Sequence, residues 1–113
     1  MSNRTADLLA FLSESPNDPF LKYALTMEYK KMGEDQLVRA GFEDLIQNHG
    51  DYVGTYYHYA KFLELAGEKD KALQIYQIGM EVAQRLKNRH AYGELQSAYK
   101  LAMGLDEDDW EDD

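Results

Sequence analysis

The stretch YYHYAKFLELAGEKDKALQIYQIGM, residues 56–80, has apolar side chains at helical spacing on both sides of a glycine. Before the glycine, apolar residues recur at i, i+3, i+4 and i+7, which is the spacing of one face of an α-helix. Gly67 marks the expected end of this helix, because glycine is common just after the last helical residue. The stretch therefore predicts two helices joined by a short turn. Their apolar stripes are Tyr56, Tyr59, Ala60 and Leu63, and then Ala72, Ile75, Tyr76, Gly79 and Met80.

The same arrangement occurs 34 residues earlier in the chain. Gly33 precedes Gly67 by this distance, and Phe42 precedes Tyr76 by it. A fixed period of this length is typical of stacked helical units that are each too small to bury an apolar face alone. Two units in register therefore predict a repeat protein. The earlier unit has the stripes Leu25, Tyr29 and Met32 and then Val38, Phe42, Leu45 and Ile46, and Leu8, Phe11 and Pro16 stand one further period back.

Residues 52–84 resemble the tetratricopeptide repeat, a family of helical hairpins with a 34-residue period and the motif W-x2-L-G-x2-Y…A-x3-F…P. Gln84 stands where proline is usual. The preceding unit is a looser match, because Lys22 stands where a large aromatic residue belongs. Phe20 or Tyr23 is expected to substitute for it through a shifted helix start. The matching residues are Tyr56, Tyr59, Ala60, Leu63, Ala72 and Tyr76, and, in the looser unit, Leu25, Thr26, Tyr29, Val38, Phe42 and Gly50.

The resemblance implies an all-α fold, a tetratricopeptide-like α-solenoid of antiparallel helical hairpins with about six helices. Thr5 is the expected N-cap of the first helix, since a threonine hydroxyl accepts a hydrogen bond from the first turn. One domain is expected over residues 1–104, followed by an acidic disordered tail over residues 105–113. The parts of the domain are an N-terminal half-repeat at 5–16, repeats at 19–50 and 53–84, and a capping helix at 89–103.

The register places Gly79 where the two helices of a hairpin approach each other closely. A leucine at this position is expected to overpack the contact. An alanine is expected to be tolerated or to stabilise the fold, because alanine is the better helix former.

The rings at residues 56–59 are expected to face different directions. Tyr56 and Tyr59 lie on the stripe that packs between the two helices, so they are predicted core residues. His58 lies off that stripe, at a helix–helix seam or in solvent. Tyr57 points the remaining way, and the resemblance implies that this direction is the concave surface on which peptide ligands lie in the family.

The resemblance also implies a peptide-binding groove with residues from both repeats. An aromatic ring and a flexible thioether beside two lysines suit a peptide with apolar and acidic groups. The alternative is local packing, in which Tyr23 and Met27 only cover the N-terminal helix. The predicted groove residues are Tyr23, Met27 and Lys30, and then Tyr57, Lys61 and Glu64.

The sequence contains no motif for catalysis or cofactor binding. It has no cysteine, which excludes thiol chemistry and cysteine-ligated metals. Its three histidines form no H-x-x-x-H or H-E-x-x-H pair, and G-x-S-x-G, P-loop and G-x-G-x-x-G motifs are missing. We therefore expect no enzyme, no cofactor and no metal site. The histidines are His49, His58 and His90.

Much of the negative charge lies in one segment, DEDDWEDD, residues 106–113, called the acidic segment below. It holds seven of the 21 acidic residues, so that the other residues carry 14 acids against 12 bases. With no basic face, nucleic acid is not an expected partner. No run approaches the roughly 18 apolar residues of a membrane span, and the first residues do not resemble a signal peptide. A cytoplasmic protein is therefore expected.

These observations predict a protein–protein interaction module that binds a peptide or a partner helix in the groove. The alternative is a structural repeat protein that self-associates as a homodimer, because a stack of two repeats has exposed apolar ends.

The acidic segment also has two interpretations. It is either a solubility device or an internal ligand, since solubility alone does not require Trp110, the single tryptophan of the chain. As a ligand it would contact the groove lysines or the basic run of Arg85, Lys87 and Arg89.

Overall fold

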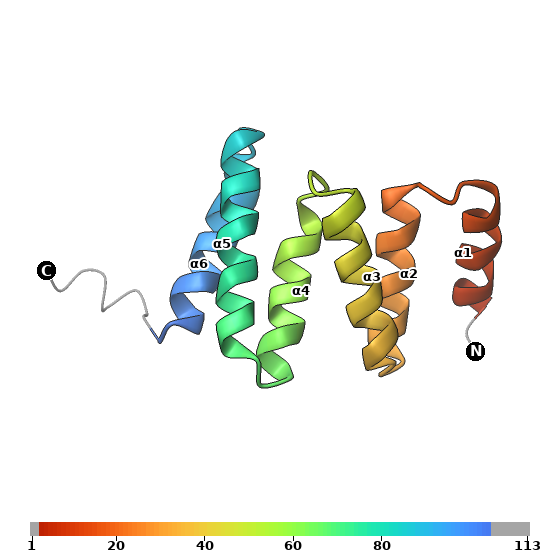
Figure 1. Cartoon of the computed structure of the whole chain (residues 1–113), viewed down its shortest axis with the longest axis horizontal. Coiled ribbons are helices and arrows are strands. Elements are labelled where there is room, and N and C mark those ends of the chain that lie inside the picture. The colour runs from red at the N-terminus through yellow and green to blue at the C-terminus, as the bar shows by residue number, and fades with distance from the viewer. Residues whose placement is uncertain (1–2, 105–113) are drawn as a thin grey trace, which may run out of the picture. The chain divides into compact units, whose positions relative to one another are not determined.

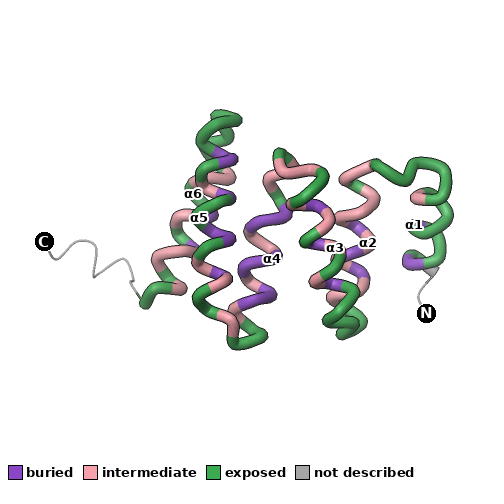
Figure 2. Tube along the Cα trace, in the orientation of Figure 1, coloured by how far each residue is buried: buried purple, intermediate pink, exposed green. Residues whose placement is uncertain are grey.

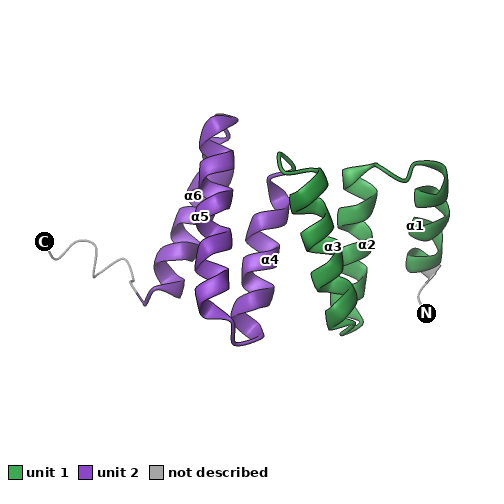
Figure 3. Cartoon of the chain, viewed as in Figure 1, with its two compact units in different colours: residues 1–52 green, residues 53–113 purple. Residues whose placement is uncertain are grey.

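The computed structural model describes residues 3–104, and these residues form six α-helices and no strand (Figure 1). The chain divides into two compact units, residues 1–52 and 53–113 (Figure 3). Within each unit, successive helices pack as hairpins, which confirms the predicted all-α fold of six helices. The predicted tail lies outside the described residues. The helices are α1 (Asn3–Glu14), α2 (Pro19–Lys31), α3 (Asp35–Asn48), α4 (Gly54–Leu65), α5 (Lys69–Arg85) and α6 (Arg89–Ala102).

In the first unit α2 is the central helix, because it packs on both α1 and α3. Asp18 caps its N-terminus, where Oδ1 accepts hydrogen bonds from the backbone N–H groups of Phe20 at 2.9 Å and Leu21 at 3.4 Å. Pro19 begins the helix, a position at which its missing N–H costs no helical hydrogen bond. Gly33 follows the helix with φ +73°, a left-handed conformation that suits glycine. The buried apolar residues of this unit are Leu8, Ala24, Val38, Phe42 and Leu45.

Lys22 keeps its own place in the repeat, so the expected shift of the helix start is wrong. The first residues of α2 and α4 are separated by one repeat period to within one residue. Lys22 Nζ pairs with Asp44 Oδ2 of α3 at 3.0 Å. Phe20 is 57% exposed and does not replace the missing aromatic residue. An ion pair between α2 and α3 therefore stands where the second hairpin has a buried tyrosine.

Thr26 of α2 and Gly41 of α3 pack closely against each other. A Cβ atom at position 41 would clash with Thr26 Oγ1, so the space beside the glycine is already filled. The Thr26 side chain is buried, and its hydroxyl donates to the carbonyl oxygen of Lys22 at 2.8 Å. The spacing of apolar residues did not indicate this contact, since neither residue belongs to an apolar stripe.

The N-terminal helix differs from the prediction in two respects. Thr5 is not an N-cap: α1 includes Asn3, so Thr5 lies inside the helix, where its buried hydroxyl contacts Met32 Sδ at 3.7 Å. Phe11 is 55% exposed, although the period aligns it with the buried Leu45. The reason is that α2 is the only described helix with which α1 has extensive contacts, and one partner covers only one side of a helix.

In the second unit three helices contact one another, because α6 packs on α5 and also on α4. Buried residues recur along α4 and α5 (Figure 2). Gly67 follows α4 with φ +81°, as the sequence predicted for the end of this helix. Tyr56 and Tyr59 are buried, which confirms their prediction as core residues. The largest fully buried side chains of this unit are Tyr56, Tyr59, Tyr76, Leu63 and Leu95.

Gly79 lies at the point where α5 contacts both of its neighbours. A Cβ atom there would lie 2.5 Å from Tyr56 Cβ of α4 and 3.1 Å from Leu95 Cδ1 of α6. The predicted close approach is therefore present. The expectation that alanine is tolerated at position 79 is wrong, because the nearest atom is the first side-chain atom of Tyr56, which cannot move away without moving the backbone of α4.

Candidate functional site

The three predicted groove residues of the first unit, Tyr23, Met27 and Lys30, all lie on α2 and are half-buried. The Tyr23 ring packs on Tyr52, with 5.5 Å between ring centroids and 50° between ring planes. Burial raises the pKa of both phenols above the ordinary value. Tyr23 therefore has a packing role within its own unit, and the sequence had not indicated Tyr52 as its partner.

The three predicted groove residues of the second unit, Tyr57, Lys61 and Glu64, lie on α4 and are also half-buried. Lys61 Nζ lies 5.7 Å from the centroid of the Tyr57 ring and 3.8 Å from Glu64 Oε2. The ring of His58 stands edge-on to Tyr57, with 5.3 Å between centroids. The Lys61 ammonium group and the His58 ring both pack against the ring of Tyr57.

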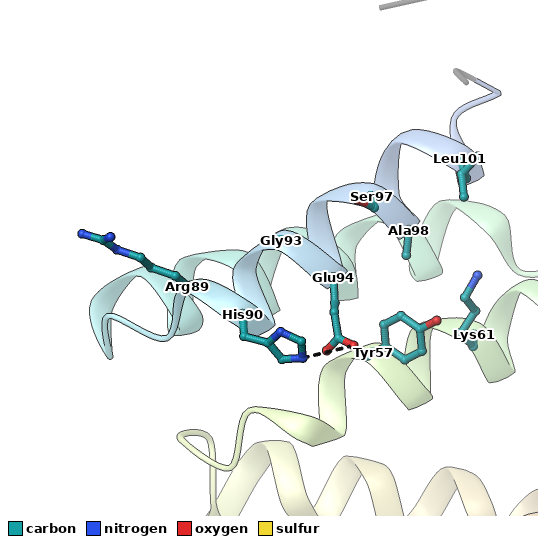
Figure 4. A pocket seen from close by; sticks show the side chains of 9 residues that line it. All are labelled: Tyr57, Lys61, Arg89, His90, Gly93, Glu94, Ser97, Ala98 and Leu101. Atoms are coloured by element: carbon teal, nitrogen blue, oxygen red, sulfur yellow. Dashed lines mark ion pairs between the residues drawn. The ribbon is translucent and has the colours of Figure 1, made fainter. Parts of the chain in front are cut away.

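Tyr57 and Lys61 form one wall of an open cleft between α4 and α6, called the α4–α6 cleft below (Figure 4). Its volume is about 620 Å³. Gly93 has no side chain, and a Cβ atom there would meet no heavy atom within 4 Å. The surface of α6 is therefore open at this point. Glu64 is not one of the lining residues. The lining residues on α6 are Arg89, His90, Gly93, Glu94, Ser97, Ala98 and Leu101.

Charged side chains lie along the rim of the α4–α6 cleft. His90 Nε2 is 3.6 Å from Glu94 Oε2, and both side chains are exposed (Figure 4). In the same view Lys61 lies beside Tyr57, and Arg89 extends outward where α6 begins. The cleft therefore combines an aromatic ring and small or apolar side chains with two permanent cations.

Glu64 has a structural partner of its own. The buried Tyr76 of α5 donates its hydroxyl hydrogen to Glu64 Oε2 at 2.5 Å. Burial, and then the neighbouring carboxylate, raise the pKa of Tyr76 far above the ordinary value for tyrosine, so the phenol stays protonated. Tyr76 was predicted only as a core residue. Its hydroxyl also fixes the carboxylate that stands beside Lys61.

The predicted basic run lies at the turn between α5 and α6. Arg85 ends α5, Arg89 begins α6, and Lys87 in the turn has φ +59°. Asn88 caps α6, where its side-chain oxygen accepts from the backbone N–H of Ala91 at 3.0 Å. A second open space of about 580 Å³ lies here, and Trp110 falls outside the described residues. This space is lined by Ala83, Gln84, Lys87, Asn88, Arg89, Tyr92 and Gly93.

The contribution of α6 to the α4–α6 cleft was missed from the sequence. The available signal was the run of short side chains at Gly93, Ser97 and Ala98, which leave room on one side of a helix. Residue spacing shows that a helix face is open, but it does not show which neighbouring helix completes a cleft with it.

Within residues 3–104 no cluster of three or more histidines and carboxylates could hold a metal ion. None of the six described helices is long and apolar enough to cross a bilayer.

Two solved structures of a tetratricopeptide repeat domain protein from Salinibacter ruber are similar to this chain. The solution NMR structure is 40% identical over 81% of this chain and 93% of its own, with a TM-score of 0.77. The crystal structure is 40% identical over 79% of this chain and all of its own, with a TM-score of 0.73. No family model and no curated protein matched the chain. At this identity and coverage, the chain belongs to the tetratricopeptide repeat family.

Proposed function

We propose that this chain is a protein-interaction module that binds a peptide segment of a partner in the α4–α6 cleft. Tetratricopeptide repeats are general protein-interaction repeats and are typically non-catalytic. The observation that carries the proposal is the cleft itself, in which two residues predicted for a groove, Tyr57 and Lys61, face a wall of small side chains on α6. The function proposed includes no catalytic step, no cofactor and no metal.

The lining of the α4–α6 cleft favours one kind of peptide. Tyr57 and Leu101 offer apolar surface to an aromatic or large aliphatic side chain. Lys61 and Arg89 carry permanent positive charge at the rim, which suits acidic groups on either side of that side chain. The ligand class is therefore an acidic segment with one large apolar residue.

The arrangement of Tyr57 lowers the entropic cost of binding. Its ring is already held between Lys61 and His58, so little side-chain freedom is lost when a ligand packs on it. Lys61 is steadied in turn by Glu64, whose carboxylate is fixed by Tyr76. The first unit is proposed to add a surface of its own through Met27 and Lys30, with Tyr23 acting mainly through its packing on Tyr52.

Gly93→Leu tests the proposal. The new side chain meets no existing atom near its Cβ position but enters the α4–α6 cleft, so it blocks a ligand without straining the fold. The exchange also replaces a glycine within a helix, which should stabilise α6 by roughly 0.5–1 kcal/mol. The probe is a phage-displayed library of random peptides selected on the unaltered chain. Selected peptides are expected to be acidic with one large apolar residue and to lose binding to the Gly93→Leu variant.

Gly54→Ala is the matched control. Gly54 begins α4, has open space beside it and does not line the cleft. Peptides should bind this variant as tightly as the unaltered chain. Retained binding to Gly93→Leu at undiminished stability would place the ligand elsewhere and reject the proposal.

Exposed apolar side chains on α1 favour a second candidate function, self-association. Leu9 is 43% exposed and Phe11 is 55% exposed on a helix whose extensive contacts among the described helices are with α2. If this surface joins two copies, sedimentation velocity will show a dimer that Phe11→Ser returns to a monomer. A monomer at every concentration would remove this candidate and leave the first untouched.

A further inference from the structure

We propose that the acidic segment of this chain, residues 106–113, is itself a ligand of the α4–α6 cleft. In this arrangement Trp110 packs on Tyr57 and on the open surface at Gly93, while the flanking acids face Lys61 and Arg89. This inference rests on the proposed function, since it takes the cleft to be a peptide site, and it names an occupant for that site.

The acidic segment and the α4–α6 cleft have opposite charges. The acidic segment contains seven carboxylates and no base in eight residues. The cleft lining contains two permanent cations, Lys61 and Arg89, against one carboxylate, Glu94, which lies beside His90. Lys87 and Arg85 extend the positive charge past the end of the cleft where α6 begins. Opposite charges on the two surfaces steer the segment toward the cleft.

The chain between α6 and Trp110 is long enough to reach the cleft. Leu101 lines the cleft one residue before α6 ends, and the described chain continues to Gly104. Gly93 lies eight residues before Leu101, which is about 12 Å along a helix. Trp110 lies six residues after Gly104, and six extended residues span up to about 20 Å. The segment can therefore turn back along α6 and bring Trp110 to the middle of the cleft without moving any helix.

The acidic segment contains one large apolar ring. Trp110 is the only tryptophan, and it stands between acids on both sides. An acidic segment that served solubility alone would have no need of a large apolar ring. The cleft has the complementary features, because Gly93 leaves a bare patch of helix surface and Tyr57 presents an ordered ring beside it. Aromatic rings in contact favour offset or edge-on packing.

Occupation of the cleft by the acidic segment makes outside ligands compete with it. The contacts between Lys61, Arg89 and the carboxylates lie at an exposed rim, so added salt weakens them. A partner peptide of the same chemistry, an apolar side chain among acids, would displace the segment. The chain would then be inhibited by its own segment and released by a stronger ligand.

Trp110 fluorescence in the full chain tests the inference, because no other tryptophan contributes to the emission. At low salt the emission is expected to be blue-shifted and protected from acrylamide, and it should shift to the red as salt is added. The double variant Lys61→Gln, Arg89→Gln should show the red-shifted, quenchable spectrum already at low salt. Gly93→Leu should do the same by steric exclusion.

Lys69→Gln is the matched control, since it removes one positive charge from an exposed position on α5 outside the cleft. It should leave the Trp110 spectrum unchanged. A water-exposed spectrum of the unaltered chain at every salt concentration would overturn the inference, and so would an equal shift in Lys69→Gln. Protection that appears only as protein concentration rises would assign the segment to a second copy and likewise reject binding within one chain.

The two proposals fail in different ways. If library peptides bind the unaltered chain and are lost in Gly93→Leu while Trp110 stays exposed, the peptide site stands and the internal ligand does not. If Trp110 is exposed and no peptide depends on the cleft, both proposals are wrong.

Discussion

Gly79 and Tyr56 are packed against each other so closely that a methyl group on the glycine would lie 2.5 Å from Tyr56 Cβ. Leu95 approaches the same point from α6, at 3.1 Å from that position. One period earlier the two positions hold Lys22 and Leu45, so the aromatic–glycine pair belongs to the second hairpin only. The loss of the aromatic residue in the first hairpin thus coincides with a large residue in place of the glycine.

Gly79→Ala and Gly93→Ala are expected to change stability in opposite directions. Both glycines lie within helices, so intrinsic propensity favours alanine at each by up to about 1 kcal/mol. At position 79 the clash with Tyr56 should outweigh this gain and give a net loss of about 1–3 kcal/mol. At position 93 a Cβ atom would meet no heavy atom within 4 Å, so the stabilisation from helix propensity should remain. Urea denaturation of the two variants decides the matter; a change of the same sign at both positions would contradict the packing described for Gly79.

Tyr59→Ala is expected to destabilise the fold far more than Tyr57→Ala. The Tyr59 ring is fully buried, with Lys71 Nζ 5.5 Å from its centroid, and truncating a buried aromatic ring costs about 3–5 kcal/mol. Tyr57 is half-buried at the cleft wall, so its loss should cost about 1 kcal/mol. Thermal unfolding measures both. Similar losses of stability in the two variants would mean that both rings are buried to the same extent.

Tyr76→Phe isolates the hydrogen bond to Glu64. The phenylalanine ring fills the same space, so the variant removes only the hydroxyl that donates to the carboxylate. A hydrogen bond to a charged group contributes about 1.5–3 kcal/mol, and a loss in this range is expected. In a Glu64→Gln background the same exchange should cost less, because the acceptor is neutral there. A double-mutant cycle with no coupling between the two positions would show that this bond does not stabilise the fold.

The ion pair of Lys22 and Asp44 should make stability depend on acid pH. The hydrogen bond from Lys22 holds the pKa of Asp44 below its ordinary value, and Asn48 adds to the effect. A carboxyl whose pKa is lower in the folded state stabilises the fold above its unfolded pKa, about 3.9, and loses this contribution as pH falls through the folded value. Because Asp44 is partly exposed, Asp44→Asn should cost about 0.5–1 kcal/mol near neutral pH.

The measurement is urea denaturation of both proteins from neutral to strongly acid pH. The difference between them should disappear at the acid end. It should also shrink in concentrated salt, since the pair lies near the surface. A difference that persists unchanged at acid pH would show that the asparagine acts through packing rather than charge.

The helices and the buried tyrosine rings could be predicted because the spacing of residues along a helix determines which side chains lie on the same face. Tyr56 and Tyr59 are three residues apart on one stripe, and no tertiary knowledge is needed to group them. The prediction that alanine is tolerated at position 79 was wrong because it considered one helix only. Propensity is a property of one helix, whereas the clash with Tyr56 depends on how near a second helix lies.

The candidate site was predictable in part for the same reason. Tyr57 and Lys61 are one turn apart on a single helix, so their common direction follows from the spacing. The partner wall on α6 depends on the angle at which α6 crosses α4, which no local pattern contains. Thr5 shows a further limit, because a residue that suits an N-cap is also accepted inside a helix when its hydroxyl finds a partner, here Met32.

The position of α5 between α4 and α6 has a consequence for how the second unit folds. Most helix contacts of this unit join helices that follow each other in sequence, α4 with α5 and α5 with α6, so the closure of two short loops is enough to bury much of the apolar surface. Proteins whose contacts are mostly local in sequence fold quickly, because little chain entropy is lost before stabilising contacts form. As the one helix with extensive contacts to both others, α5 is the natural nucleus, and a substitution at Gly79 is expected to slow folding more than it speeds unfolding.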